Sequence, residues 1–410
     1  HPRVRRQRQM CIRDRNFMYT LLLIIIYLAF ISLGLPDSLL GSAWPVMQQN
    51  FQVPISYAGI VTMIISGGTI CSSLMSDRLT KNLGTGIVTT VSVLLTAVAL
   101  FGFSTANAFW MLCLWAIPYG LGAGAIDAAL NNYVALHYSS RHMSWLHCFW
   151  GVGTIASPYI MSYSLTHSSW QNGYRVVSMI QITITIILIL SLSLWKLQKA
   201  KNSTKQEGKS LGLKNALKIK GVPQLLLGFF AYCSAEATVM LWVSSYLVRT
   251  RGMEEEKAAS FAALFFIGIT VGRFLSGVVS EKLGDRKLIR IGTSIIAIGI
   301  ICILLPVTTN LFVLSGFIII GLGCAPVYPS IIHSTPNNFG EENSQSIIGI
   351  QMASAYIGST FMPPLFGLIA NHISIQLLPV YLIFFTLLMI VMIEKTYKIV
   401  HLKKETISFE

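Results

Sequence analysis

Gly120-Leu-Gly-Ala-Gly-Ala-Ile-Asp-Ala-Ala-Leu-Asn-Asn-Tyr133 places one aspartate and two asparagines inside an apolar segment. Asp127 and Asn131 are four residues apart, so a helix puts both side chains on the face that also carries Gly120 and Gly124. A charged side chain at the centre of a bilayer costs ~2.5–3.5 kcal/mol on insertion scales, and such residues face a bundle interior or a water-filled cavity. Asp127 is therefore a candidate functional residue.

The composition indicates a protein that crosses the membrane many times. Of the 410 residues, 53% are hydrophobic and 11% are charged, whereas soluble domains carry about 25% charged residues. The net charge of +14 is spread between apolar stretches and is not gathered on one face. We therefore expect a lipid bilayer around the protein and no nucleic-acid partner.

Residues 1–15 are treated separately from the rest of the chain. The segment Arg5-Arg-Gln-Arg-Gln-Met-Cys-Ile-Arg-Asp-Arg15 resembles one reading frame of a transposase sequencing adapter. We expect residues 1–15 to be an adapter-derived artefact that is not part of the fold. Without their six arginines and one aspartate, the net charge falls from +14 to +9.

Twelve apolar stretches are long enough to cross the hydrocarbon core, which takes about 20 helical residues. They predict an all-α membrane protein with twelve transmembrane helices. Their approximate ranges are 18–48, 54–75, 84–105, 109–138, 143–166, 172–196, 221–248, 257–281, 287–306, 310–334, 345–370 and 375–395.

A polar segment with eight lysines, Lys196–Lys220, divides the spans into two sets of six. We expect an N-terminal six-helix bundle over 16–198, a basic cytoplasmic linker over 199–220, a C-terminal six-helix bundle over 221–398 and a cytoplasmic tail over 399–410.

The two halves repeat each other at an offset of about 200 residues. Gly34-Leu-Pro-Asp37, followed by Trp44, is echoed by Cys233-Ser-Ala-Glu236, followed by Trp242. Parallel repeats of this kind are typical of transporters whose halves rock about a midplane site. The sequence therefore predicts two pseudo-symmetric six-helix bundles with a binding site between them.

The lysines and arginines predict the orientation of the chain in the membrane. With both termini in the cytoplasm, 19 of them lie in cytoplasmic segments and only four lie outside, at Arg175, Arg249, Arg251 and Lys257. Cytoplasmic loops carry the excess of positive charge, so we expect both termini in the cytoplasm. One further cation, Arg273, falls inside the eighth span.

A loop pattern follows the second and eighth spans. Gly277-Val-Val-Ser-Glu-Lys-Leu-Gly-Asp-Arg-Lys287 and its degraded copy around Ser73-Leu-Met-Ser-Asp77-Arg78 resemble the cytoplasmic loop signature of the major facilitator superfamily. The alternative is an ordinary charged membrane loop. The resemblance implies a role in conformation, and not in substrate contact, for Asp77, Arg78, Gly277, Glu281, Lys282 and Arg286, and we also expect a gating role for Arg273.

Within that superfamily the chain is similar to the fucose–galactose–proton symporter, or fucose permease-like, family. The similarity covers essentially all residues after 16 and is carried by Gly34–Asp37, Asp127–Ala135, Leu146–Gly153 and Gly228–Trp242. In that family an acid in the first helix and one in the fourth are implicated in proton coupling and substrate recognition, which implies these roles for Asp37 and Asp127. The family pattern differs by a glutamate at Asp127 and a glutamine at His147, which leaves the substrate open.

Carboxyl groups inside the membrane are suited to carry protons. Burial raises the pKa of a carboxyl group, so small changes in hydration load or release its proton near neutral pH. We predict proton coupling by Asp37, Asp127 and Glu236. The alternatives are a structural acid bonded to Asn131 or to a neighbouring cation for Asp127, a kink-stabilising group after Pro36 for Asp37, and a cation ligand or packing acid for Glu236.

Sugars need planar polar partners for their hydroxyl groups and aromatic faces for their C–H surfaces. His147 in the fifth span matches Gln351 in the eleventh. The alternatives are a satisfied core histidine for His147 and interface or packing roles for the tryptophans. The predicted substrate-binding residues are Asn131, Asn132, His147, Gln351, Trp44, Trp150 and Trp242.

These patterns predict a monomeric secondary transporter of the bacterial inner membrane that takes up a sugar together with protons or sodium ions. A drug exporter on the same fold and a sugar sensor that does not transport are the alternatives. The fifth span reads Gly153-Thr-Ile-Ala-Ser-Pro158 without a double glycine, which counts against export. The acidic loops lack the clustered carboxylates of a membrane-embedded enzyme, so we expect no enzymatic activity, no metal and no cofactor.

Overall fold

The computed structural model describes residues 2–54, 57–202, 211–306 and 309–408. These residues form helices joined by short turns, and twelve of the helices have at least 20 residues. The long helices are α1 (Pro2–Gly34), α3 (Ala58–Leu83), α4 (Thr85–Ser104), α5 (Phe109–His137), α6 (Ser140–His167), α7 (Trp170–Asn202), α9 (Val222–Arg251), α10 (Glu255–Leu283), α11 (Asp285–Leu304), α12 (Asn310–His333), α14 (Glu341–Ile369) and α15 (Leu378–Ser408).

Nine segments among the described residues are long and apolar enough to cross a membrane. The last of them, Glu341–Val400, contains α14 and most of α15, and the first, Met18–Trp44, contains the break after α1. The long helices α6 and α10 complete the twelve. Many large apolar side chains on these helices are exposed, among them Leu190 and Phe384, as expected for surfaces that face lipid.

The first predicted span is two helices instead of one. α1 ends at Gly34, a turn covers 35–38, and α2 (Leu39–Phe51) continues the chain. Pro36 lies in this turn, where its missing N–H and its ring favour a break in the helix. The break matters for function because it places Asp37 outside regular helix.

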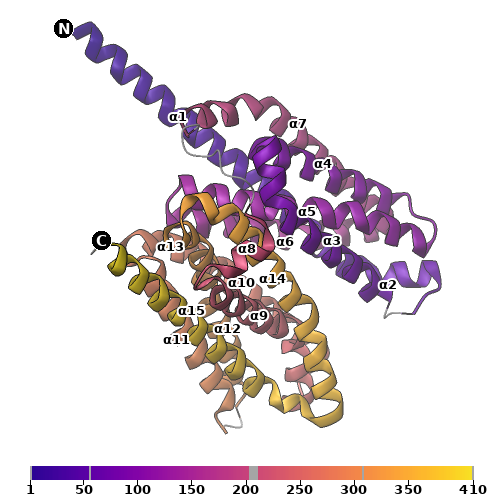
Figure 1. The fold of residues 1–410 in the computed structure, drawn as a ribbon. Helices are drawn as coiled ribbons and strands as arrows, with labels where there is room; N and C mark the ends of the chain where they lie inside the picture. The colour runs from indigo at the N-terminus through magenta and orange to yellow at the C-terminus, as the bar shows by residue number, and fades with distance from the viewer. Residues whose placement is uncertain (1, 55–56, 203–210, 307–308, 409–410) are drawn as a thin grey trace.

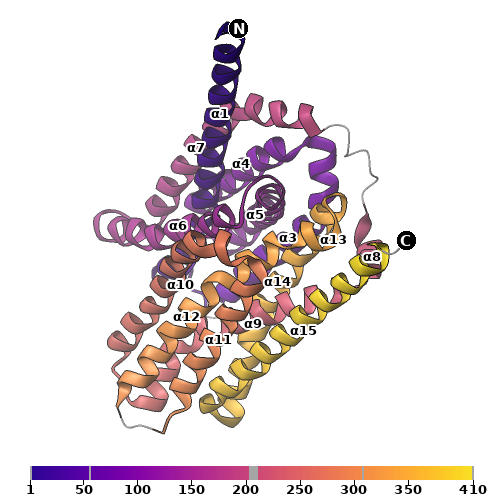
Figure 2. The same cartoon turned by 90° about the vertical axis from the view of Figure 1, so that its left-hand side faces the viewer.

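The helices pack as two sets with the same internal pairing. In the first half α1 packs on α6, α3 on α5, and α4 on α5 and α7; in the second half α9 packs on α14, α10 on α12, and α11 on α12 and α15. Figures 1 and 2 show the two sets as separate bundles, with the start of α1 projecting away from both. The predicted all-α architecture of two pseudo-symmetric halves is confirmed.

Part of the predicted linker lies outside the described residues. On either side of 203–210, α7 ends at Asn202 and the short helix α8 (Gly212–Lys218) packs against α9 and α14. The predicted domain boundaries and the expectation that residues 1–15 are an artefact stay predictions.

The two halves meet closely at one end of the molecule. This closed end is formed by the last turns of α5, α10 and α12 and the first turns of α6, α11 and α14. Ser139 and Arg141 both contact Glu281, at 2.8 and 2.7 Å. Ser344 donates to Asn132 Oδ1 at 2.6 Å. These bonds hold the first half against the second.

A second cluster at the closed end surrounds Asp285. Its carboxylate accepts from Ser140 at 2.7 Å and lies 2.7 Å from His333 Nδ1. His333 Nε2 lies 3.3 Å from the carbonyl oxygen of Tyr138. The cluster therefore joins the loop between α5 and α6 to α11 and α12 of the other half.

Candidate transport site

A cavity of about 350 Å³ lies between the halves and is lined by both. From the first half it is lined by α1, the turn after it, α2 and α3 to α7, and from the second by α9, α10, α12 and α14. Phe103 and Tyr174, near the ends of α4 and α7 that lie away from the closed end, also line it. The cavity therefore extends from the middle of the molecule away from the closed end.

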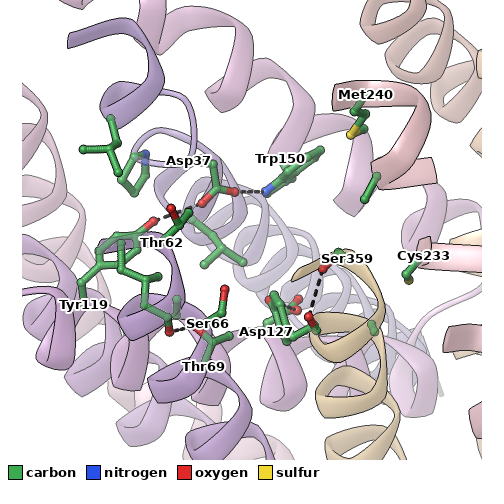
Figure 3. A pocket seen from close by; sticks show the side chains of 18 of the residues that line it. Asp37, Thr62, Ser66, Thr69, Tyr119, Asp127, Trp150, Cys233, Met240 and Ser359 are labelled. Carbon is green, nitrogen blue, oxygen red and sulfur yellow. Dashed lines mark hydrogen bonds between the residues drawn. The ribbon is translucent and has the colours of Figure 1, made fainter. Parts of the chain in front are cut away.

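Asp37 projects into this cavity from the turn after α1. Its Oδ1 accepts from the Tyr119 hydroxyl at 3.1 Å and its Oδ2 from Trp150 Nε1 at 2.9 Å, as Figure 3 shows. The approach to α6 requires glycine at position 34, because a Cβ there would overlap the carbonyl oxygen of Trp150. Both hydrogen-bond donors to this exposed carboxylate are neutral.

Asp127 lies deeper and is 5% exposed. Its Oδ1 accepts from Asn131 Nδ2 at 2.7 Å and its Oδ2 from the Tyr356 hydroxyl at 2.8 Å. Tyr356 belongs to α14, so this bond joins the two halves. Figure 3 shows Asp127 beside the face of α3 that carries Thr69. Gly124, one turn earlier, lets α5 approach α3 closely, since a Cβ there would meet Thr69 and Ser72.

His147 and Asn131 extend the network from Asp127. His147 Nε2 lies 3.0 Å from Asn131 Oδ1, and the imidazole packs edge-on against Phe30 and Tyr328. His147 lines the cavity, whereas Asn131 has no exposed surface and does not line it. The predicted pair of Asp127 and Asn131 is therefore present, but only Asp127 reaches the cavity.

Glu236 and Arg273 form an ion pair on the opposite wall. Arg273 Nη2 lies 3.3 Å from Glu236 Oε1, and both residues are buried. The guanidinium also lies 5.4 Å from the ring centroid of Trp150 and 6.0 Å from that of Tyr328. Arg273, which we grouped with the loop pattern, thus lies in the cavity beside Trp150, which contacts Asp37.

Besides Asn131, four predicted substrate-binding residues do not line the cavity. Asn132 lies at the closed end, and Gln351 is fully buried and accepts from Thr335 at 3.1 Å. Trp44 packs in the apolar cluster around α2. Trp242 donates to the carbonyl oxygen of Pro363 at 2.9 Å. Of the predicted tryptophans, Trp150 alone lines the cavity.

The predicted loop-pattern residues lie at the closed end or near it. Glu281 joins the halves through Arg141, Gly277 packs closely against Trp145, and Arg286 pairs with Glu394 at 2.7 Å within the second half. In the first half Asp77 lies 3.2 Å from Lys81, and Arg78 is exposed, as is Lys282.

Three residues of these networks escaped the sequence analysis. Tyr119 and Tyr356 donate hydrogen bonds to the carboxylates of the two cavity acids. His333 lies within hydrogen-bond distance of Asp285. The only sequence signals for the two tyrosines are their positions, since Tyr119 directly follows Pro118 and Tyr356 comes five residues after Gln351. Among the described residues no group of three His, Cys, Asp or Glu side chains is placed to hold a metal ion.

Two packed six-helix bundles around a central cavity, to which both contribute charged and aromatic side chains, are typical of a membrane transporter. The Major Facilitator Superfamily profile matches residues 26–263 and 225–407. The chain belongs to this superfamily. It is a multi-pass secondary transporter and not an enzyme.

The similar proteins of known name are distant in sequence. The Bacillus subtilis glucose/mannose transporter GlcP is 21% identical over 359 residues, which cover 86% of this chain and 88% of GlcP. The structure of FucP in the outward conformation superposes with a TM-score of 0.69 at 15% identity, over 92% of this chain and 99% of FucP. The proton:xylose symporter XylE gives a TM-score of 0.76 at 12% identity, over 94% of this chain and 96% of XylE.

Proposed function

We propose that this transporter takes up a neutral sugar or a related polyol together with protons. The observation that carries the proposal is the pair of cavity acids, Asp37 and Asp127, whose hydrogen-bond donors are all neutral. With no cation bonded to it, a carboxylate can take up a proton without breaking an ion pair.

The chemistry of the donors supports proton exchange. A tyrosine hydroxyl donates to an ionised carboxylate and accepts from a protonated one. Tyr119 and Tyr356 therefore remain hydrogen-bonded to their acids in both protonation states. Asp127 also contacts the other half through Tyr356, so a change in its charge alters a bond between the halves. This link gives proton binding a means to affect the movement of one half against the other.

The lining of the cavity supports a sugar as the substrate. Its volume of about 350 Å³ lies at the lower end of the range for small-molecule sites. Trp150, Tyr328 and Tyr356 offer aromatic surface, and His147 and the two acids offer hydrogen-bonding groups. GlcP is named as a glucose/mannose transporter, FucP as a fucose:proton symporter of E. coli and XylE as a proton:xylose symporter. These names agree with the chemistry of the lining.

The direction of access follows from the expected orientation. If the positively charged loops are cytoplasmic, the closed end faces the cytoplasm, and the cavity extends toward the outside. We propose that the structure is an outward-facing state of an inner-membrane protein with both termini in the cytoplasm. FucP, similar in fold, was solved in an outward conformation.

The test is uptake into proteoliposomes of a panel of labelled hexoses under imposed proton or sodium gradients. We expect a proton gradient to drive accumulation of at least one hexose. Asp127→Asn should abolish that accumulation and preserve exchange of the same sugar without a gradient. Equal accumulation by the variant and the parent would show that Asp127 is not the coupling group. Drug efflux on expression without hexose uptake would favour the exporter instead.

A further inference from the structure

We propose that His147 accepts a hydrogen bond from a substrate hydroxyl through Nδ1, and that Asn131 acts as a positioning residue that fixes the required tautomer of the imidazole. The identity of the ligand as a hydroxyl-bearing solute rests on the proposed function. The tautomer and its dependence on Asn131 do not.

The orientation of the Asn131 amide follows from its surroundings. Asn131 Nδ2 lies 2.7 Å from Asp127 Oδ1 and 3.0 Å from the backbone carbonyl oxygen of Asp127. The backbone oxygen can only accept, and so can the carboxylate oxygen while Asp127 is ionised, so an amide oxygen in the same place would face two oxygens with no hydrogen between them. The amide nitrogen therefore points to Asp127, and Oδ1 points away from it, toward His147.

This orientation determines which nitrogen of His147 carries the proton. Asn131 Oδ1 can only accept, and it lies 3.0 Å from Nε2, so Nε2 must carry the hydrogen. A neutral imidazole has one N–H and one acceptor nitrogen. Nδ1 is consequently the acceptor, and among the described residues the hydrogen bond of the imidazole is the one from Nε2 to Asn131.

The ring is held so that Nδ1 remains available to a ligand. Phe30 and Tyr328 pack edge-on against it, with ring centroids 5.5 and 4.7 Å away. His147 is 5% exposed, and it lines the cavity. The hydrogen bond to Asn131 and the two rings together limit rotation of the imidazole. Because His147 lines the cavity, Nδ1 is the acceptor that this side chain can offer to a hydroxyl group there.

The charged groups around this ring come from two other helices. Asp127 on α5 acts through Asn131, and Arg273 on α10 lies within electrostatic range of the imidazole. The groups that α1 and α12 present to it, Phe30 and Tyr328, are neutral aromatic rings. The direct contacts of the ring are therefore all with uncharged groups, consistent with a neutral imidazole.

The first experiment is nitrogen-15 NMR of the full chain in nanodiscs with labelled histidine at neutral pH. The His147 signals are assigned by their loss in His147→Gln. We expect a protonated Nε2 and an unprotonated Nδ1 in the parent, and both tautomers in Asn131→Ala. Asn132→Ala is the matched control, since Asn132 bonds to Ser344, and it should leave the signals unchanged. A protonated Nδ1 in the parent, or signals unaffected by Asn131→Ala, would overturn the proposal.

The second experiment measures binding of the transported hexose and its monodeoxy analogues by tryptophan fluorescence. One analogue should bind the parent about tenfold more weakly, and His147→Phe should bind that analogue and the hexose equally. If His147→Phe weakens the binding of every ligand by the same factor, the ring acts by shape alone and the proposal fails. If no hexose binds, the proposed function fails and the NMR result still decides the tautomer.

Discussion

The acids on the two walls of the cavity are held in different ways. In the first half Asp37 and Asp127 accept hydrogen bonds from tyrosine, tryptophan and asparagine, which are all neutral. In the second half Glu236 is bonded to the guanidinium of Arg273. The repeat places Asp37 and Glu236 at matching positions, so the difference lies in the partner and not in the fold.

The partner decides how many protonation states an acid can adopt. A guanidinium has donors and no acceptor, so it stabilises Glu236 only while that carboxylate is ionised. A tyrosine hydroxyl can form a hydrogen bond with both the ionised and the protonated acid. We infer that the first half exchanges protons, whereas the second half carries a fixed ion pair beside the substrate.

The largest expected effect is on stability in the second half. Arg273→Met leaves Glu236 buried without its cation, and breaking a buried pair from one side costs ~3–5 kcal/mol. The double variant Glu236→Met/Arg273→Met should recover most of that loss, since neither charge remains. Thermal unfolding in detergent measures both, with Asp37→Asn as a control that we expect to change stability little. Equal losses for the single and double variants would contradict the ion-pair interpretation.

The next effect is on the pH dependence of uptake. Proton-coupled uptake by the parent should fall as the external pH rises, because the cavity acids then remain ionised. Asp127→Asn should leave only downhill uptake that lacks this dependence, and the double variant at Glu236 and Arg273 should retain the dependence at a lower rate. The comparison between the walls fails if the double variant is the one that loses its pH dependence.

A smaller effect is expected from the hydroxyl that links the walls. Tyr356→Phe removes a donor from the Asp127 carboxylate, and a hydrogen bond to a charged group contributes ~1.5–3 kcal/mol. The loss weakens the ionised form in particular, so the external pH for half-maximal uptake should move upward, by about one unit or more. A pH series of initial uptake rates measures the shift. A downward shift would show that Tyr356 instead stabilises the protonated acid.

The smallest effect concerns how α14 brings Tyr356 to Asp127. Gly349 packs against α3 of the other half, and a Cβ there would lie 2.6 Å from the Ser73 carbonyl oxygen. Gly349→Ala should push α14 outward and reproduce part of the Tyr356→Phe shift in the same uptake series. Gly358→Ala introduces a similar clash on the same helix, but against Phe230 within the second half. A shift in this control as large as that in Gly349→Ala would exclude a specific effect between the halves.

Much of the architecture follows from residues that act locally. Apolar stretches of about 20 residues must become helices in a bilayer, because every backbone polar group needs an internal partner. The echo of Gly34–Asp37 in Cys233–Glu236 revealed the two halves, and the cost of a membrane carboxylate drew attention to Asp127. Each of these signals can be read without knowing which helices touch.

The composition of the cavity wall depended on rotation and packing. Asn131 and Asp127 share a helix face, yet the amide is buried behind the carboxylate. Gln351 matches His147 in the repeat, yet it bonds to Thr335 away from the cavity. The rotation of a helix about its own axis decides whether a side chain lines the cavity or packs away from it, and the apolar background of a membrane helix gives little indication of that rotation.

The sequence by itself determined the helical class, the two halves and the acids whose placement in a membrane is energetically costly. Only the tertiary structure decided that Tyr119, Trp150 and Tyr356 hold two of those acids and that Arg273 holds the third. The physical reason is the distance along the chain over which each effect acts. Helix formation and the cost of burying a charge depend on one segment and its solvent, whereas the choice between a neutral and a charged partner depends on side chains up to 229 residues apart.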